Sequence, residues 1–351
     1  MMKQLLVFRA DADGVMGTGH VMRCLALAEA WRDQGGEVLF AGRIEPEALR
    51  RRIEAERFGL LALAGGYPDP TDLAVMQQLA EEQLSRHASL GWLVLDGYHF
   101  DAVYQQAMRD AGWQLLVIDD LGLLAEYHCE ALLNQNLYAS ELDYQCSPGA
   151  TMLLGPQYAL LRREFRLSGQ ERVFPTVARR VLVTMGGADQ YNVTVKVLHA
   201  LAASGIEELE VKAVLGGANA HAGELALLAA GLPFRCELVR DVSDMATLMR
   251  WADVVVTAAG TTTYELACLG TPFVTIVTAD NQEANADTLA RQGVAGALGW
   301  HHTLAPDVLT SRLREFLQDG GQRKAQAGMG RELVDGLGCG RVIDVMRNEE
   351  R

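Results

Sequence analysis

Short apolar runs alternate with amphipathic stretches along the chain. In the first half the apolar runs are "LLVF" (5–8), "EVLFA" (37–41), "WLVLD" (92–96), "QLLVID" (114–119) and "TMLL" (151–154). Helical patterns fall between them, near 20–34, 46–57, 72–89 and 101–111. This alternation predicts a parallel sheet whose strands are joined by crossover helices.

The same pattern restarts in the second half. "RVLVTMGG" (180–187) has the pattern of a strand that ends in a Gly-rich turn, and further strands are expected at 211–217, 234–239, 252–260 and 272–278. The polar stretch 166–179 is the expected linker. We therefore predict an α/β chain with two Rossmann-like, doubly wound domains at 1–165 and 180–330, followed by a helix in 331–351 that packs back on the first domain. Ligands of such folds bind outside the carboxyl ends of the strands, so the expected site is the cleft between the domains.

Composition narrows the classes of function. The net charge of −14 over 351 residues argues against a nucleic-acid groove. The sequence has no apolar stretch of about 18 residues, so no membrane span is expected. Its opening apolar run is too short for a secretory signal. The six cysteines form no C-x-x-C pair and fit reduced thiols in a cytoplasmic protein. The oligomeric state stays open.

We expect neither a metal nor a bound cofactor. No group of His, Cys and Asp residues in the sequence has the spacing of a zinc site or of a two-metal site. The segment "DAD" at 11–13 comes nearest to a metal motif, and Asp119–Asp120 is the one adjacent acidic pair in an expected loop. An essential divalent cation is therefore not predicted.

The first Gly-rich loop, "GTGHVMR" (17–23), follows the first strand and opens a helix. The backbone N–H groups of Gly17 and Gly19, together with the helix dipole, suit an anion or a polar sugar group. The two glycines fit a plain tight turn equally well. A dinucleotide fingerprint would need a third glycine where Met22 stands.

His20 lies at the predicted start of this helix. The helix dipole disfavours an imidazolium there, so a neutral ring is available as a base. A lone histidine is also often structural. Asp11 and Asp13 lie just upstream, and each is either a group that orients the ring or a solvated loop carboxylate.

A second loop of this kind occurs in "TAAGTTTYELACLGTPF" (257–273). Small residues, Gly260 among them, turn the chain after a strand. Thr261, Thr262 and their neighbour in the "TTT" run can cap the next helix, whose N-terminus is a second anion site.

Three polar residues follow the strands of the second half. Glu265, in the first helical turn, either complements the helix dipole or accepts hydrogen bonds from ribose hydroxyls. Asn281 and Gln282, at the start of the following helix, either cap it or donate to a phosphate or sugar.

An ordered set of motifs resembles a known family. From about residue 7 to 290 the chain contains "FRADADGVMGTGHVMRCLALA", "LDGY", "IDDL", "LLNQNLYA", "LLGPQYALLRREF", "VTMGGADQYN", "TYELACLGTPF" and "DNQ". Together these resemble the UDP-sugar hydrolases of pseudaminic acid biosynthesis, the PseG family. More distantly, the chain is similar to MurG-type glycosyltransferases.

The resemblance implies a GT-B fold, with two Rossmann-like domains facing across a cleft. It also implies hydrolysis of a UDP-linked 2,4-diacetamido-2,4,6-trideoxyhexose to the free sugar and UDP, in nonulosonic acid biosynthesis. In this resemblance His20 is the general base and Tyr98, in "DGYHF", lies near the reacting sugar. The expected substrate-binding residues are Arg9, Asp11, Gly17, Gly19, Gly186, Gly187, Gly260, Thr261, Thr262, Glu265, Asn281 and Gln282.

Two other functions stay open. One is a GT-B glycosyltransferase that uses a UDP-sugar for surface polysaccharide synthesis. The other is a non-catalytic subunit that binds a nucleotide sugar. Release of UDP and sugar in the absence of an acceptor separates the hydrolase from the transferase, and binding without turnover would indicate the subunit.

Overall fold

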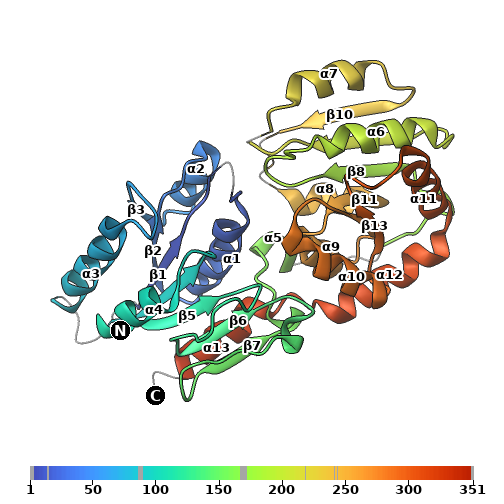
Figure 1. The fold of residues 1–351 in the computed structure, drawn as a ribbon. Coiled ribbons are helices and arrows are strands. Elements are labelled where there is room, and N and C mark those ends of the chain that lie inside the picture. The colour runs from blue at the N-terminus through green and yellow to red at the C-terminus, as the bar shows by residue number, and fades with distance from the viewer. Residues whose placement is uncertain are drawn as a thin grey trace. The chain divides into compact units, whose positions relative to one another are not determined.

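The computed structural model describes residues 4–13, 16–85, 90–166, 172–217, 219–240, 242 and 244–348. The chain divides into two compact units. One comprises Met1–Arg163 with Gly336–Arg351, and the other comprises Glu164–Asp335. Each unit has a parallel sheet flanked by helices (Figure 1). This confirms the predicted α/β class with two doubly wound halves.

Within the described residues, the sheet of the first unit has seven parallel strands in the order β3-β2-β1-β4-β5-β6-β7. The strands are β1 (Leu5–Ala10), β2 (Glu37–Gly42), β3 (Gly59–Ala62), β4 (Trp92–Asp96), β5 (Gln114–Ile118), β6 (Ala131–Asn134) and β7 (Thr151–Leu154). The helices are α1 (Gly19–Asp33), α2 (Glu47–Ala55), α3 (Pro70–Leu84), α4 (Ala102–Asp110) and α13 (Gly338–Asn348), with the 3-10 helices η1 (Ala139–Glu141) and η2 (Pro156–Tyr158). The short helix α5 (Arg163–Arg166) spans the boundary between the units.

Strand β1 shows how the first sheet is buried on both faces. Successive side chains of a strand point to opposite faces. Leu6 and Phe8 therefore pack with α1, α2 and α13, whereas Val7 packs with α3 and α4. Because both faces are covered, the strands are continuous apolar runs, as is typical of parallel sheets. Asp69 and Asp101 cap the first turns of α3 and α4.

Helix α13 belongs to the first unit although it follows the second in sequence. Its residues Val342, Ile343 and Met346 are fully buried in the same apolar cluster as α1. The indole Nε1 of Trp92 donates to the carbonyl oxygen of Met346 at 3.0 Å. Residues 338–348 therefore complete one face of the first sheet.

The second unit is contiguous in sequence. In its described part, six parallel strands have the order β10-β9-β8-β11-β12-β13. They are β8 (Arg180–Thr184), β9 (Glu210–Val214), β10 (Arg235–Val239), β11 (Val254–Ala258), β12 (Phe273–Val277) and β13 (Gly296–Trp300). The helices are α6 (Val193–Ala203), α7 (Ala222–Ala230), α8 (Met245–Trp251), α9 (Thr262–Leu269), α10 (Glu283–Arg291), α11 (Pro306–Gln318) and α12 (Gly320–Leu333), with the 3-10 helix η3 (Asp280–Gln282). Residues of α6 and α11 share the main apolar cluster, and α9 packs against α12.

Three strands of the structure were not predicted from the sequence. Strand β3, "GLLA", begins with glycine and is only partly buried, and β6, "ALLN", was not recognised although β7, of the same length, was. Strand β13, "GALGW", is rich in glycine, which is depleted in strands. Residues 86–89 of the helix expected at 72–89 and residues 167–171 of the expected linker lie outside the described residues. Among the described helices, none combines the length and the apolar character that crossing a bilayer requires.

Candidate functional site

Both sheets have a point where the strand order reverses. Ligands of doubly wound folds bind outside the carboxyl ends of the strands at that point. The reversal lies between β1 and β4 in the first unit and between β8 and β11 in the second. Most predicted site residues follow the carboxyl end of a strand: His20 after β1, Tyr98 after β4, Gly186 and Gly187 after β8, and residues 260–265 after β11.

His20, the second residue of α1, is held by the carboxylate of Asp96, the last residue of β4. Nδ1 of His20 lies 2.6 Å from Oδ1 of Asp96, and both side chains are buried. A carboxylate only accepts hydrogen bonds, so we assign the proton to Nδ1 and the lone pair to Nε2. Nη2 of Arg23, which is a donor, also lies 3.3 Å from Nδ1, but the carboxylate of Asp96 is much closer and sets the tautomer. Nε2 is therefore the nitrogen that can accept a proton.

Arg23, one turn after His20 on α1, keeps Asp96 charged. Its Nε donates to Oδ2 of Asp96 at 2.6 Å and its Nη2 donates to Oδ1 at 2.7 Å. Burial would raise the pKa of Asp96, but the charge of Arg23, which donates to both carboxylate oxygens, outweighs burial and holds this pKa well below its usual range. The resulting stabilisation of the folded state is present above the unfolded-state pKa of about 3.9. It is lost as the pH falls from there through the folded-state value.

Asp120 takes the other edge of the same guanidinium. Nη1 of Arg23 donates to Oδ1 of Asp120 at 2.8 Å, and Nη2 donates to Oδ2 at 3.0 Å. Nδ2 of Asn136 also donates to Oδ1 of Asp120, at 2.9 Å. Burial would raise the pKa of Asp120, yet the charge of Arg23 lowers it. Two carboxylates therefore share one buried cation, which leaves excess negative charge beside His20.

Tyr98 lies next to His20, so the structure brings the two predicted catalytic residues together. Their rings meet edge to face, with centroids 5.0 Å apart and an interplanar angle of 84°. The hydroxyl of Tyr98 donates to Oδ2 of Asp120 at 3.0 Å, and the residue is 45% exposed. Tyr98 thus lies at the solvent-exposed edge of this buried hydrogen-bond network.

Asp11 and Asp13, which were considered as partners of His20, have other partners. Asp11 accepts a hydrogen bond from Nη1 of Arg9 at 2.6 Å and another from a backbone N–H after β2 at 2.7 Å. Oδ1 of Asp13 accepts from a backbone N–H of its own loop at 2.7 Å. The ring-orienting position belongs to Asp96 instead.

Arg9 lies in β1 with its side chain fully buried. It pairs with Asp11 and, through Nε at 3.1 Å and through Nη2, with Asp72. The hydroxyl of Tyr104 donates to Oδ1 of Asp72 at 2.8 Å. These contacts favour a role for Arg9 in fixing Asp11 and its loop. A direct contact of Arg9 or Asp11 with substrate stays a prediction.

The loop before α1 uses its glycines in two ways. Gly17 has φ +78°, in the left-handed region that favours glycine, and its N–H donates to the carbonyl oxygen of Asp13 at 3.0 Å. Gly19 is exposed and opens α1, and the first N–H groups of a helix lack partners within the helix. Gly14 and Val15, between Asp13 and these glycines, lie outside the described residues.

In the second unit, the loops after β8 and β9 approach each other closely. Gly186 has φ +82° and therefore needs the freedom of glycine. A Cβ at Gly216 would lie 2.1 Å from the carbonyl oxygen of Gly187, so Gly216 permits the contact.

The loop after β11 is fixed by two side chains behind it. Oγ1 of Thr263 donates to the carbonyl oxygen of Gly260 at 2.7 Å, and Nδ2 of Asn285 donates to that of Ala259 at 2.9 Å. Helix α9 then begins at Thr262. These two contacts set the backbone of the turn that carries the predicted residues. In the described structure Thr261 stands at the N-cap position without a side-chain cap hydrogen bond.

The remaining predicted residues of the second unit lie on α9 and η3. Glu265 is partly buried in the first turn of α9. Asn281 is exposed on η3, and Oε1 of the neighbouring Gln282 accepts hydrogen bonds from N and Oγ1 of Thr278, at 3.0 and 3.1 Å. Gln282 therefore supports its own loop, and contact of these residues with a nucleotide sugar stays a prediction.

In the described part of the chain, no three His, Cys, Asp or Glu side chains lie close enough together to bind a metal ion. The carboxylates of "DAD" are used otherwise, Asp11 by Arg9 and Asp13 by its loop. Independence from metal stays a prediction for experiment.

Sequence reasoning missed Asp96, Arg23 and Asp120. Signals for all three exist in the sequence. Asp96 is a charged residue at the end of the apolar run "WLVLD", and Arg23 is three residues after His20, on the same helix face. Asp120 belongs to the acidic pair after β5.

Comparison with known proteins identifies the fold. Residues 180–333 match the family model "Glycosyltransferase family 28 C-terminal domain". The spore coat polysaccharide biosynthesis protein SpsG of Bacillus subtilis is 29% identical over 195 residues, which are 55% of this chain and 57% of that protein, so the match spans little more than half of the relative. The UDP-2,4-diacetamido-2,4,6-trideoxy-beta-L-altropyranose hydrolase of Campylobacter jejuni is 24% identical over 296 residues, 82% of this chain and 97% of that protein.

Among solved structures, MurG of Acinetobacter baumannii is similar, with a TM-score of 0.66, 18% identity and 99% of both chains covered. The similarity extends over both units of the chain. The protein therefore has the GT-B fold seen in MurG, with a second half that matches the C-terminal domain of glycosyltransferase family 28.

Proposed function

We propose that this chain hydrolyses a UDP-linked diacetamido-trideoxyhexose to the free sugar and UDP. The observation that carries the proposal is the buried pair of His20 and Asp96 at the carboxyl edge of the first sheet, with Tyr98 beside it. An anion cradle needs only backbone N–H groups. A histidine with a fixed tautomer is what activation of water requires. The relative from Campylobacter jejuni, whose name is that of such a hydrolase, supports the same activity.

In the proposed reaction, water attacks the anomeric carbon while Nε2 of His20 takes its proton. A new C–O bond forms on the face opposite the leaving group, and the bond between the anomeric carbon and the diphosphate oxygen breaks. Its electron pair leaves with UDP, which is a good leaving group, so little help from a general acid is needed. Asp96 stabilises the imidazolium that forms, and Arg23 keeps Asp96 charged throughout.

The second unit holds UDP in this proposal. The N-terminus of α9, after the turn at Gly260, suits the diphosphate, as do the backbone N–H groups near Gly186 and Gly187. Glu265 accepts hydrogen bonds from the ribose hydroxyls, and Asn281 and Gln282 line the sugar side. The match of residues 180–333 to a glycosyltransferase domain supports this assignment.

A glycosyltransferase is the second candidate, and the same family match favours it. His20 would then take a proton from an acceptor hydroxyl in place of water. Incubation with the UDP-sugar alone separates the two activities. A hydrolase releases UDP and sugar in equal amounts, whereas a transferase without acceptor releases little, and a binding subunit releases neither.

Labelled water sharpens this test. In H₂¹⁸O, attack at the anomeric carbon places ¹⁸O in the sugar and leaves UDP unlabelled, as mass spectrometry would detect. Label in the nucleotide product would mean cleavage at phosphorus and would contradict the proposed step at His20.

Glu265→Ala should weaken UDP binding by about tenfold or more, because each hydrogen bond to a charged group contributes roughly 1.5–3 kcal/mol and about 1.4 kcal/mol is one decade of affinity. Titration calorimetry with UDP measures the change. Glu315→Ala is the control, since Glu315 is an exposed carboxylate on α11 of the same unit. Equal UDP affinity in both variants would remove Glu265 from the nucleotide site.

EDTA should leave the rate of UDP release unchanged, because helix N-termini and side-chain donors offset the diphosphate charge in the proposed site. The assay compares enzyme dialysed against EDTA with enzyme supplied with Mg²⁺ or Mn²⁺. Activity that disappears in EDTA and returns with either cation would show that a metal is required.

A further inference from the structure

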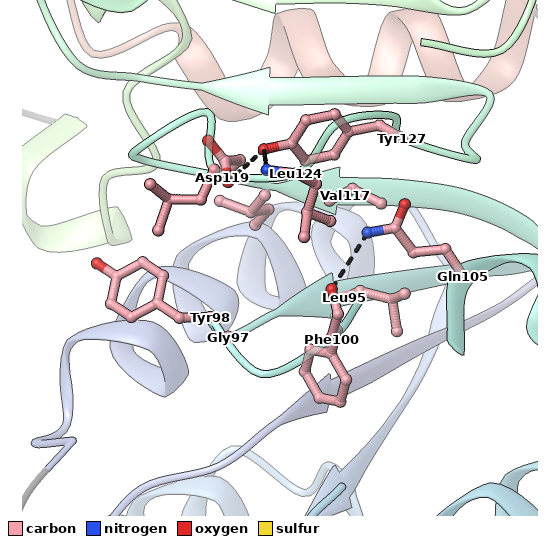
Figure 2. A pocket seen from close by; sticks show the side chains of 11 residues that line it. Leu95, Gly97, Tyr98, Phe100, Gln105, Val117, Asp119, Leu124 and Tyr127 are labelled. Atoms are coloured by element: carbon pink, nitrogen blue, oxygen red, sulfur yellow. Dashed lines mark hydrogen bonds between the residues drawn. The ribbon is translucent and has the colours of Figure 1, made fainter. Parts of the chain in front are cut away.

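A small cavity opens beside the candidate catalytic residues in the first unit. It has a volume of about 30 Å³ and lies at the carboxyl ends of β4 and β5 (Figure 2). Figure 2 shows Tyr98 at one end of the cavity and Gln105 at the other. The lining residues are Leu95, Gly97, Tyr98, Phe100, Gln105, Val117, Ile118, Asp119, Leu123, Leu124 and Tyr127.

The polar side chains that line the cavity are hydrogen-bonded to other groups of the protein. Nε2 of Gln105 donates to the carbonyl oxygen of Phe100 at 3.3 Å, and Oε1 of Gln105 accepts from the backbone N–H of His128 at 2.9 Å. The hydroxyl of Tyr127 donates to Oδ1 of Asp119 at 3.1 Å. The interior of the cavity therefore presents mainly the apolar side chains of β4, β5 and the following loops.

Two exposed apolar side chains belong to the same cavity. Leu123 is 72% exposed and Tyr98 is 45% exposed. Large apolar groups left in water beside a cavity favour an occupant that covers them. The ring of Tyr98 also contacts His20, with 5.0 Å between centroids, so an occupant beside Tyr98 lies near the nitrogen that would act on the sugar.

We propose that this cavity is a subsite for the acyl methyl group of an acylamino substituent on the sugar, an inference that rests on the proposed function. One water-sized group needs about 10–15 Å³ by this measure, so the cavity takes a methyl group and the carbon that bears it. A free amino group is not the preferred occupant. It would need a carboxylate to pair with, and the described contacts show none in the wall that lacks hydrogen-bond partners. The substrate in the name of the relative from Campylobacter jejuni carries two acetamido groups, which suits an acyl pocket.

The test uses a series of UDP-sugars that differ in one N-acyl group: formyl, acetyl and propanoyl, at each amino position in turn. At the position that enters the cavity, the formyl analogue should lose about fourfold in kcat/KM, the fold-change that corresponds to about 0.8 kcal/mol for one buried methylene-sized group. The propanoyl analogue should lose about tenfold, because it exceeds the cavity. The other amino position should tolerate all three groups.

Variants at Val117, whose side chain lines the cavity, should move this preference in opposite directions. Val117→Ile fills the space and should make the formyl analogue the best substrate. Val117→Ala enlarges it and should favour the propanoyl analogue. The matched control is Val103→Ile, because Val103 is 69% exposed on α4 and does not line the cavity. If Val117→Ile does not fold, the change in acyl preference of Val117→Ala alone tests the subsite.

Binding of the series is measured beside turnover, so that the two proposals fail separately. Acyl selectivity in Kd without UDP release would contradict the hydrolase and retain the subsite. Turnover with equal kcat/KM across the series, unchanged in both Val117 variants, would overturn the subsite and mark the cavity as a packing void. A chain that binds none of the analogues would overturn both.

Discussion

His20→Asn should lower kcat for UDP release by about 10²- to 10⁴-fold, the usual contribution of a general base. Asparagine keeps a polar side chain near Asp96 but has no basic nitrogen. UDP affinity should change little, because UDP is assigned to the second unit. Steady-state kinetics and calorimetry on the same preparation measure both quantities. His199→Asn, at an exposed position of α6, is the matched control.

The pH profile gives a second readout on the same group. In the wild type, kcat/KM should be lost in acid, because a general base acts only while its lone pair is free. Asp96 adds no step of its own near neutrality, since its pKa is held well below its usual range. An Asn variant that turns over within a few-fold of the wild type would make His20 a structural residue, and Tyr98 or a loop carboxylate would become the candidate base.

Asp96→Asn should lower kcat by about 10- to 10³-fold and should not exceed the loss in His20→Asn. An amide in place of the carboxylate can donate to Nδ1, which favours the wrong tautomer and removes the charge that stabilises the imidazolium. Steady-state rates of UDP release for the two variants, measured side by side, test this order.

The double variant separates an effect through His20 from a general loss of structure. If Asp96 acts by orienting His20, the His20→Asn, Asp96→Asn variant should be about as slow as His20→Asn alone. Losses that multiply would instead assign Asp96 an independent role. Asp96→Asn should also lower the midpoint of thermal unfolding, since Arg23 loses one of the two carboxylates with which it pairs in the described structure. Asp110→Asn, at an exposed position that ends α4, is the control for both measurements.

Much of the fold follows from local sequence. The alternation of apolar runs and helical patterns predicted both parallel sheets, because central strands such as β1 and β11 are buried on both faces. The Gly-rich loops after β1 and β11 were recognisable because each follows one of these predicted strands. Strands β3 and β6 escaped prediction, and their strand character is evident only in their parallel pairing with β2, β5 and β7.

The candidate site was likewise predicted from the sequence only in part. His20 was marked by its position in a loop that opens a helix. Its partner Asp96 is 76 residues away in sequence, and their contact depends on the parallel pairing of β1 with β4, which places Asp96 beside Ala10. Sequence reasoning therefore offered the nearby Asp11 and Asp13 as possible orienting groups, whereas Asp11 pairs with Arg9 of β1. A buried ion pair between distant elements becomes apparent only once the strand order is known.

The return of α13 to the first unit separates the order of synthesis from the order of folding. Residues 164–335 form one uninterrupted unit, whereas the first sheet lacks the helix that covers Trp92 until residues 338–348 have been made. At ~5–20 residues per second, a ribosome needs roughly 10 to 35 s to travel from Arg163 to the middle of α13. During that interval the nascent first sheet keeps one apolar flank uncovered, so of these two units the one whose synthesis starts earlier is completed later.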